Sequence, residues 1–232
     1  ILRGRAIGVT LDVGQLGIGE IDEIRQNMGY FGITHYVVTP PLEPFIALFA
    51  DTVDAEEKRN IFGDEYVTRM IEFADEHSIT DIAQGTTLPD LIESGATGGA
   101  VIKTHHNAKK DWHGRRLLEP IKHPFKPEVR ELAGTIGLPK AITEREPSPG
   151  HGELIRVIGK PVTLERLDIV KTARKRVRTI LIKHGLDRTI SQLVVAYIGV
   201  NTSGVKGSGR AYTGSICVRP MQTVNYMTAN GV

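Results

Sequence analysis

The chain has 232 residues, a length that suits one large domain or two small ones. Apolar residues make up 40% and charged residues 24%, which is ordinary for a soluble globular protein. No apolar run is long enough to span a bilayer and no signal peptide opens the chain, so we expect a cytoplasmic location without a membrane partner. The single cysteine, Cys217, excludes an internal disulfide and argues against a cysteine-based zinc site.

The net charge of +2 is the sum of an acidic and a basic half of the chain. Residues 151–232 carry 13 Lys and Arg against 4 Asp and Glu, whereas residues 1–150 carry 16 against 23. Such a split often indicates two units with different partners, and the basic half could bind an anionic nucleotide or contact nucleic acid. In a second interpretation, the acidic and basic surfaces pack on each other or on a partner.

Strand and helix patterns alternate through the first part of the chain. Apolar runs predict strands over residues 5–10, 34–38, 80–84 and 117–120. Helical spacing of apolar residues predicts helices over residues 18–28, 56–76 and 127–136. This alternation predicts an α/β fold in which crossover connections join the strands of a parallel sheet.

A stretch rich in proline and glycine, residues 146–152, predicts a loop at the boundary of two units. Beyond it we expect strands over 154–158, 191–199, 204–205 and 214–218, and one long helix over 164–184 that Gly185 caps. The chain would then consist of a first unit, residues 1–146, and a small α+β unit, residues 147–232.

Two features of the second unit have structural interpretations. The long helix presents a basic face, which we expect to be solvated or to face an interface; its residues are Lys171, Arg174, Lys175 and Arg178. Cys217 lies in an apolar strand, so we expect a buried structural thiol rather than a reactive one.

The most informative stretch is residues 81–107. Its strand ends at Gln84, after which two threonines can cap a short helix with Pro89 in the first turn. Asp90 and Glu93 are three residues apart and share one face of that helix. A glycine-rich segment then leads to three further polar residues, Lys103, His105 and His106. These side chains should gather at the carboxyl edge of a strand, where open α/β sheets bind ligands.

This stretch resembles the ATP-pyrophosphatase part of GMP synthase, the glutamine-dependent ligase family that aminates xanthosine monophosphate. In the archaeal form of that family, the ATP-pyrophosphatase part is a separate subunit. The matching segments occur in family order along nearly the whole chain: residues 53–59, 83–86, 89–94, 102–107, 118–121, 126–132, 137–139 and 227–229. One such segment would be weak evidence, but the ordered set is specific. The segment with paired histidines is the sharpest match.

The resemblance implies an adenine-nucleotide α-hydrolase-like fold, the PP-loop ATPase fold, followed by a dimerisation domain that would make a homodimer. The sequence lacks the family's serine-glycine-glycine-valine-aspartate-serine loop, which cradles pyrophosphate. The chain begins at Ile1, where the family's second strand would begin, and ends at Val232, before its lysine-rich carboxyl-terminal segment. We therefore expect either a fragment truncated at both ends or a protein that has lost its phosphate cradle.

The resemblance also implies catalytic residues. Lys103 matches a lid lysine that would reach the α-phosphate of ATP once substrate is bound. Asp90 and Glu93 would position Lys103 or orient a magnesium-bound phosphate, although helix capping by Asp90 and solvation of Glu93 are open alternatives. His105 and His106 point to opposite sides of an extended segment, so we expect one of them to contact phosphate.

Binding residues follow from the same resemblance. ATP's adenosine would lie near strand ends, at Asp12, Gly14, Gln84 and Gly85, where plain turn chemistry is the alternative interpretation. The monophosphate of the substrate would bind the loop with Pro149, Gly150 and Gly152, together with Arg156. Gln192 would contact substrate or form a buried hydrogen bond. Ser148 and His151 depart from the family's usual phenylalanine and proline, which affects the expected fit of the substrate base.

The implied reaction is the ATP- and Mg²⁺-dependent amination of xanthosine 5′-phosphate to GMP through an adenylated intermediate. No cysteine in the chain has the setting of a glutaminase nucleophile, so a glutamine amidotransferase subunit or domain would supply ammonia; we expect no nucleic-acid partner. Two alternatives stay open. Residues 10–15 resemble argininosuccinate synthase, another PP-loop ligase, and the missing cradle favours a non-catalytic paralogue that acts as a dimeric scaffold or regulatory subunit.

Overall fold

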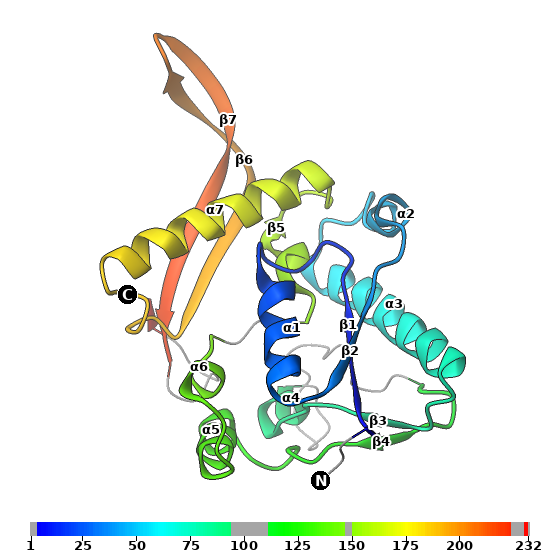
Figure 1. Ribbon diagram of the computed structural model, residues 1–232. Coiled ribbons are helices and arrows are strands. Elements are labelled where there is room, and N and C mark those ends of the chain that lie inside the picture. Colours follow the sequence, from blue (N-terminus) through cyan, green and yellow to red (C-terminus); the bar gives the residue numbers. More distant parts are fainter. Residues whose placement is uncertain (1–3, 94–110, 147–149, 224–229, 232) are drawn as a thin grey trace.

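The computed structural model describes residues 4–93, 111–146, 150–223 and 230–231, and it has a mixed α/β fold (Figure 1). Strands and helices alternate in the first part of the chain, and a long helix and a projecting β-hairpin follow. None of the helices in the described ranges is both long and apolar enough to cross a membrane.

The first part contains two pairs of parallel strands. Strand β1 (Ile7–Leu11) pairs with β2 (Thr34–Val38), and helix α1 (Glu20–Tyr30) connects them. Strand β3 (Asp81–Ala83) pairs with β4 (Arg116–Leu118). The expected parallel pairing is confirmed, but within the described residues the strands form two two-stranded sheets rather than one sheet.

Helices connect and cover these strands. The longest, α3 (Ala55–Glu76), links the two sheets; shorter helices are α2 (Leu42–Ala47), α4 (Leu88–Glu93), α5 (Lys126–Thr135) and α6 (Lys140–Thr143). Helix α3 begins where it does because the Asp54 carboxylate accepts hydrogen bonds from the amides of Glu56 and Glu57, both at 2.9 Å. The sequence pattern predicted this helix to within one residue.

The second part consists of a helix on a four-stranded sheet. The 3₁₀ helix η1 (Gly152–Arg156) leads into β5 (Val157–Ile158) and then helix α7 (Leu164–Lys183). Strands β6 (Gln192–Lys206) and β7 (Gly209–Gln222) form an antiparallel hairpin, and β8 (Asn230–Gly231) pairs with β7. The far end of the hairpin projects beyond the rest of the molecule (Figure 1).

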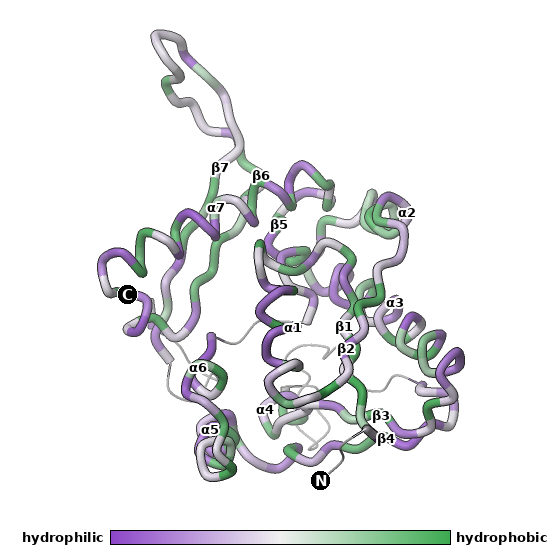
Figure 2. Tube along the Cα trace, in the orientation of Figure 1, coloured by the Kyte–Doolittle hydropathy of each residue, from purple (hydrophilic) through white to green (hydrophobic). Residues whose placement is uncertain are grey.

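One apolar cluster joins the two parts of the chain. It includes Val13 after β1 and Phe62 in α3 together with Leu154, Val157 and Val170 from the second part, all at most 1% exposed. Figure 2 shows apolar residues along β1 and β2 and near the base of the hairpin, whereas the hairpin's far end is mostly of intermediate hydropathy. The core therefore packs η1 and α7 directly against the first part.

Three expectations for the second part were wrong. Residues 154–156 are 3₁₀-helical, so the expected strand over 154–158 is reduced to its last two residues. The three short strands expected beyond α7 are parts of two long ones. Cys217 is exposed rather than buried, because α7 packs against β6 and leaves much of β7 uncovered.

Candidate functional site

A hydrogen-bonded turn follows β1. The Asp12 carboxylate accepts a 3.0 Å hydrogen bond from the Gly14 amide, and Gly14 has a φ of +81°. The buried side chain of Gln15 accepts a bond from the Val13 amide at 2.8 Å and donates one to the Leu11 carbonyl at 2.6 Å. Turn chemistry, the alternative interpretation of Asp12 and Gly14, is thus present. It also places the half-buried Asp12 at the carboxyl edge of β1.

The end of β3 has unsatisfied polar atoms. Gln84 is only 7% exposed, and neither atom of its side-chain amide has a hydrogen-bond partner within the described part of the chain. The same holds for the hydroxyl of Thr86, and the neighbouring Gly85 is exposed. Because buried polar groups are nearly always hydrogen-bonded, this strand end has donors and an acceptor available for a polar ligand.

Helix α4 begins directly after this strand end. Both the amide and the hydroxyl of Thr87 donate to the Asp90 carboxylate, at 2.9 and 2.7 Å. These bonds make Asp90, rather than a threonine hydroxyl, the acceptor at this helix start, so Asp90 has the capping role that was the alternative to catalysis. Several catalytic candidates lie outside the described residues: Lys103, His105, His106 and the side chain of Glu93.

The turn after β1 contacts the segment predicted to bind the substrate's phosphate. Gly152 is buried, has a φ of +50°, and lies so close to Gln15 that a β-carbon would come within 2.1 Å of the Gln15 carbonyl oxygen. The next amide, that of Glu153, donates a 2.9 Å hydrogen bond to the same oxygen. Gly150 lies in the turn just before, and Pro149 is outside the described residues. The structure therefore brings the two predicted nucleotide-binding segments together.

Two arginines lie near this contact. Arg156 is partly buried, and among the described residues its guanidinium has no hydrogen bond or ion pair. Burial lowers the pKa of Arg156, and the nearby Glu153 opposes that shift. Arg59 in α3 donates to the ring of His151 at 3.3 Å. Sequence reasoning did not select Arg59, although it lies in the matching segment 53–59.

Gln192 begins β6 and is partly buried. Its side chain has no hydrogen bond within the described residues, so the alternative of a buried hydrogen-bonded glutamine is not observed. The amide of the next residue, Leu193, donates a 2.7 Å hydrogen bond to the Glu146 carboxylate. This hydrogen bond holds the start of β6, and with it Gln192, next to Glu146, which directly precedes the predicted phosphate loop.

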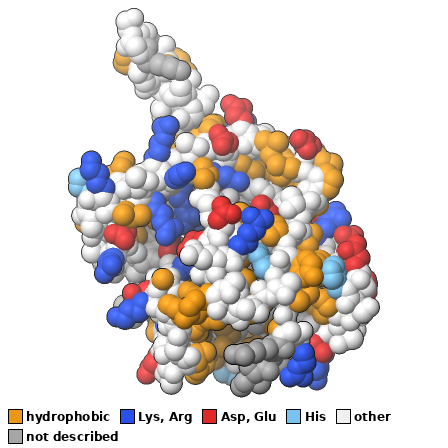
Figure 3. All heavy atoms as spheres, viewed as in Figure 1, with side chains coloured by type: hydrophobic (Ala, Val, Ile, Leu, Met, Phe, Trp, Pro, Cys, Tyr) orange, Lys and Arg blue, Asp and Glu red, His pale blue; other side chains and the backbone are white. Residues whose placement is uncertain are grey.

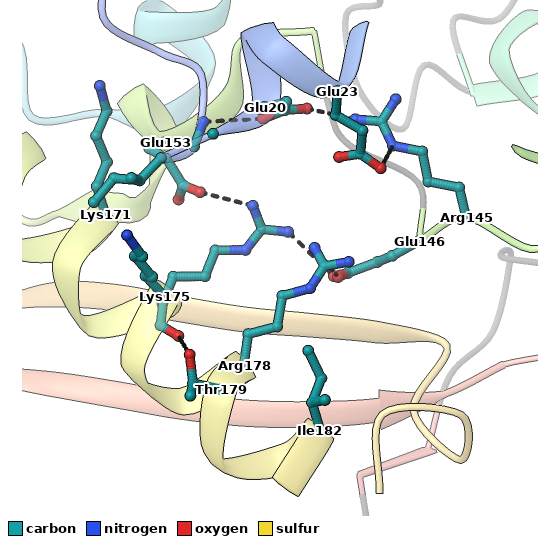
Figure 4. A pocket seen from close by; sticks show the side chains of 14 residues that line it. Glu20, Glu23, Arg145, Glu146, Glu153, Lys171, Lys175, Arg178, Thr179 and Ile182 are labelled. Atoms are coloured by element: carbon teal, nitrogen blue, oxygen red, sulfur yellow. Dashed lines mark hydrogen bonds and ion pairs between the residues drawn. The ribbon is translucent and has the colours of Figure 1, made fainter. Parts of the chain in front are cut away.

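A cavity of about 240 Å³ lies where acidic residues of the first part meet the basic face of α7 (Figure 4). Glu146 of the first part pairs with two arginines of α7, Arg174 at 3.4 Å and Arg178 at 3.9 Å. Figure 3 shows Lys and Arg side chains gathered over α7, with Asp and Glu side chains beside them. The second interpretation of the charge distribution, an acidic surface packed on a basic one, is confirmed.

Comparisons with known proteins find one family model and several relatives that this chain resembles. The family described as GMP synthase C terminal domain matches residues 179–232. A GMP synthase [glutamine-hydrolyzing] from Ligilactobacillus salivarius (strain UCC118) is 36% identical over 240 residues, which cover 99% of this chain and 46% of the relative. The chain is a homologue of GMP synthase.

Two further GMP synthases [glutamine-hydrolyzing] show the same pattern. The relative from Streptomyces coelicolor (strain ATCC BAA-471 / A3(2) / M145) is 37% identical over 96% of this chain and 44% of its own length. The relative from Oleidesulfovibrio alaskensis (strain ATCC BAA-1058 / DSM 17464 / G20) is 38% identical over 100% of this chain and 47% of its own length. The chain thus spans just under half the length of the GMP synthases that it matches.

The matched GMP synthase C-terminal domain comprises the end of α7 and all of β6, β7 and β8. Within the described ranges, no three His, Cys, Asp or Glu side chains are grouped so that they could hold a metal ion. A magnesium site in this GMP synthase homologue therefore stays a prediction, as do its ATP site and its PP-loop fold.

Proposed function

We propose that the intact protein uses ATP and Mg²⁺ to aminate xanthosine 5′-phosphate to GMP through an adenylated intermediate. Ammonia would come from a glutamine amidotransferase subunit or domain. The homology to GMP synthase supports the reaction class. The structural observation that carries the proposal is the contact between Gly152 and Gln15, because a ligase must hold its two nucleotides side by side.

On the ATP side, we assign binding to Asp12, Gly14, Gln84 and Gly85. The amide of Gln84 supports this assignment because it is buried, lacks a partner in the described residues, and offers both donors and an acceptor. These atoms fit the hydroxyl and ring nitrogen groups of a nucleoside.

For catalysis, we assign to Lys103 the stabilisation of charge that develops on the α-phosphate. Asp90 and Glu93 would position this lysine or the magnesium-bound phosphates, and either His105 or His106 would contact phosphate. Asp90 also caps α4 through its hydrogen bonds with Thr87.

On the substrate side, we assign the 5′-phosphate to Arg156 and to the backbone near Pro149, Gly150 and Gly152. A guanidinium without an ion pair among the described residues is suited to bind phosphate with a charge-assisted hydrogen bond. Gln192 would contact the substrate from the start of β6. We assign residues 1–146 to an ATP-pyrophosphatase domain and residues 147–232 to the domain that forms a homodimer, in a cytoplasmic enzyme.

The test compares xanthosine 5′-phosphate with xanthosine by calorimetry in the intact protein. An arginine–phosphate contact contributes about 1.5–3 kcal/mol. We therefore expect Arg156→Ala to weaken monophosphate binding roughly tenfold or more and to leave xanthosine binding nearly unchanged. Arg176→Ala, an exposed arginine of α7, is the control and should change neither. Equal binding of both ligands by the unmodified protein would refute the substrate assignment and favour a scaffold.

A further inference from the structure

One guanidinium connects the two chain positions that flank the candidate phosphate-binding segment. Arg174 of α7 lies 3.4 Å from the Glu146 carboxylate and 3.0 Å from the Glu153 carboxylate. Positions 146 and 153 come just before and just after the segment that contains Gly150 and Gly152. Arg174 therefore spans this segment at its two ends.

The three side chains are largely removed from water. The side chain of Arg174 is 17% exposed, that of Glu146 is 16% exposed, and that of Glu153 is 4% exposed. Exposed ion pairs contribute little because water screens them, whereas loss of one partner of a buried pair leaves an uncompensated charge. The bridge is therefore a specific constraint on positions 146 and 153 rather than a surface contact.

Glu146 and Glu153 each also form a hydrogen bond with a backbone group, which connects them to the neighbourhood of a candidate binding residue. Glu146 accepts a 2.7 Å hydrogen bond from the Leu193 amide, adjacent to Gln192. The Glu153 amide donates a 2.9 Å hydrogen bond to the Gln15 carbonyl, in the turn after β1. Glu146 and Glu153 both line the cavity drawn in Figure 4, and the Arg174 guanidinium pairs with both carboxylates.

We propose that Arg174 is a positioning residue of the monophosphate site. It holds positions 146 and 153 at a fixed separation, so that the backbone at Gly150 and Gly152 and the guanidinium of Arg156 are arranged before substrate binds. Such preorganisation raises affinity because substrate binding need not order these groups. The inference rests on the proposed function, since it concerns the same phosphate site.

The shape of the side chain matters as much as its charge. The guanidinium is planar and presents several donors, so Nη1 faces Glu153 while Nη2 faces Glu146. A lysine ammonium is a compact point charge at a single centre. Arg174→Lys should therefore keep a cation in the cavity and hold only one end of the segment.

The experiment measures the ratio of xanthosine 5′-phosphate affinity to xanthosine affinity in the intact protein. We expect Arg174→Gln to lower this ratio at least fivefold and Arg174→Lys to lower it by a smaller factor. A general loss of structure would instead weaken both ligands together and leave the ratio unchanged. Lys175→Gln is the matched control, because this lysine lines the same cavity from the same helix but has no ion pair in the described residues. The affinity ratio of the Lys175→Gln variant should stay within twofold of that of the unmodified protein.

The possible outcomes separate the two proposals. If the unmodified protein binds both ligands equally, the proposed function fails and the role of Arg174 fails with it. If the unmodified protein prefers the monophosphate and Arg174→Gln keeps the same preference, only the role of Arg174 is refuted. An equal loss of the affinity ratio in Lys175→Gln would also refute the role of Arg174, because the effect would then be one of cavity charge.

If circular dichroism shows that Arg174→Gln does not fold, the Arg174→Lys variant is the deciding test. An unchanged affinity ratio in Arg174→Lys would refute the role of Arg174, and a lowered ratio would support it.

Discussion

Gly152 and Gln15 are in direct backbone contact. A β-carbon at position 152 would lie 2.1 Å from the Gln15 carbonyl oxygen, a distance that no real side chain tolerates. The backbone at 152 also has a φ of +50°, which favours glycine. The turn after β1 and the start of η1 are thus joined at a point where only glycine fits.

The first prediction tests this contact. Gly152→Ala should lower the free energy of unfolding by about 2–4 kcal/mol, because overpacking adds to the strain of a positive φ. Gly19→Ala separates the two causes, since Gly19 has a φ of +88° but open space around it. Gly19→Ala should lower the free energy of unfolding by only about 1–2 kcal/mol. Urea unfolding measures both, and equal losses would mean that the 152 contact relaxes easily.

The second prediction concerns the start of α3. Asp54→Ala removes the carboxylate that accepts bonds from the amides of Glu56 and Glu57. It should lower the free energy of unfolding by about 1 kcal/mol, the usual value for a helix cap. Asp51→Ala, at an exposed residue just before the helix, is the control and should change stability by less than about 0.5 kcal/mol. A loss of the same size in both variants would rule out a specific capping effect.

Local signals explain what the sequence predicted well. Strand β2 has the predicted bounds because Pro40 and Pro41 cannot continue it. Helix α3 was found from the helical spacing of its apolar residues. The strand end at Gln84 was likewise apparent, since an apolar run stops there. Each of these signals lies within a few residues of the feature that it predicts.

The remaining features depend on contacts between distant segments. Residues 154–156 read as a strand, but Gly152 and Glu153 must meet Gln15, and the chain turns into η1 instead. The exposure of Cys217 depends on which strand α7 covers, which the strand's own composition does not reveal. The bridge from Arg174 to Glu146 and Glu153 was anticipated only as a charge imbalance, because partners 21 and 28 residues away have no local signature.

The third prediction concerns a buried lysine between the two parts of the chain. Lys58 in α3 is 1% exposed, and its ammonium donates to the carbonyls of Val157 and Lys160, both at 2.7 Å. Lys58→Met should lower the free energy of unfolding by about 2–4 kcal/mol, because both carbonyls lose their donor. Lys160→Met is the control, since that side chain is exposed. A stable Lys58→Met variant would show that the burial cost of the ammonium cancels its hydrogen bonds.

The fourth prediction concerns the pH dependence of stability. Burial raises the pKa of Glu153 above the ordinary value of 4.5, although Arg174 and Arg156 oppose the shift. The folded protein therefore binds the Glu153 proton more tightly than the unfolded chain does. The resulting stabilisation is fully present below pH 4.5 and is lost as the pH rises through the folded-state pKa.

Glu153→Gln removes this titration and keeps an oxygen that can accept a hydrogen bond from Arg174. The difference in the free energy of unfolding, original minus variant, should therefore decrease as the pH rises from 4.5. Urea unfolding at a series of pH values measures this difference, and Glu131→Gln, at an exposed position of α5, serves as the control. A difference that instead increases with pH would mean that the ion pair with Arg174 outweighs burial and that the folded state favours the ionised carboxylate.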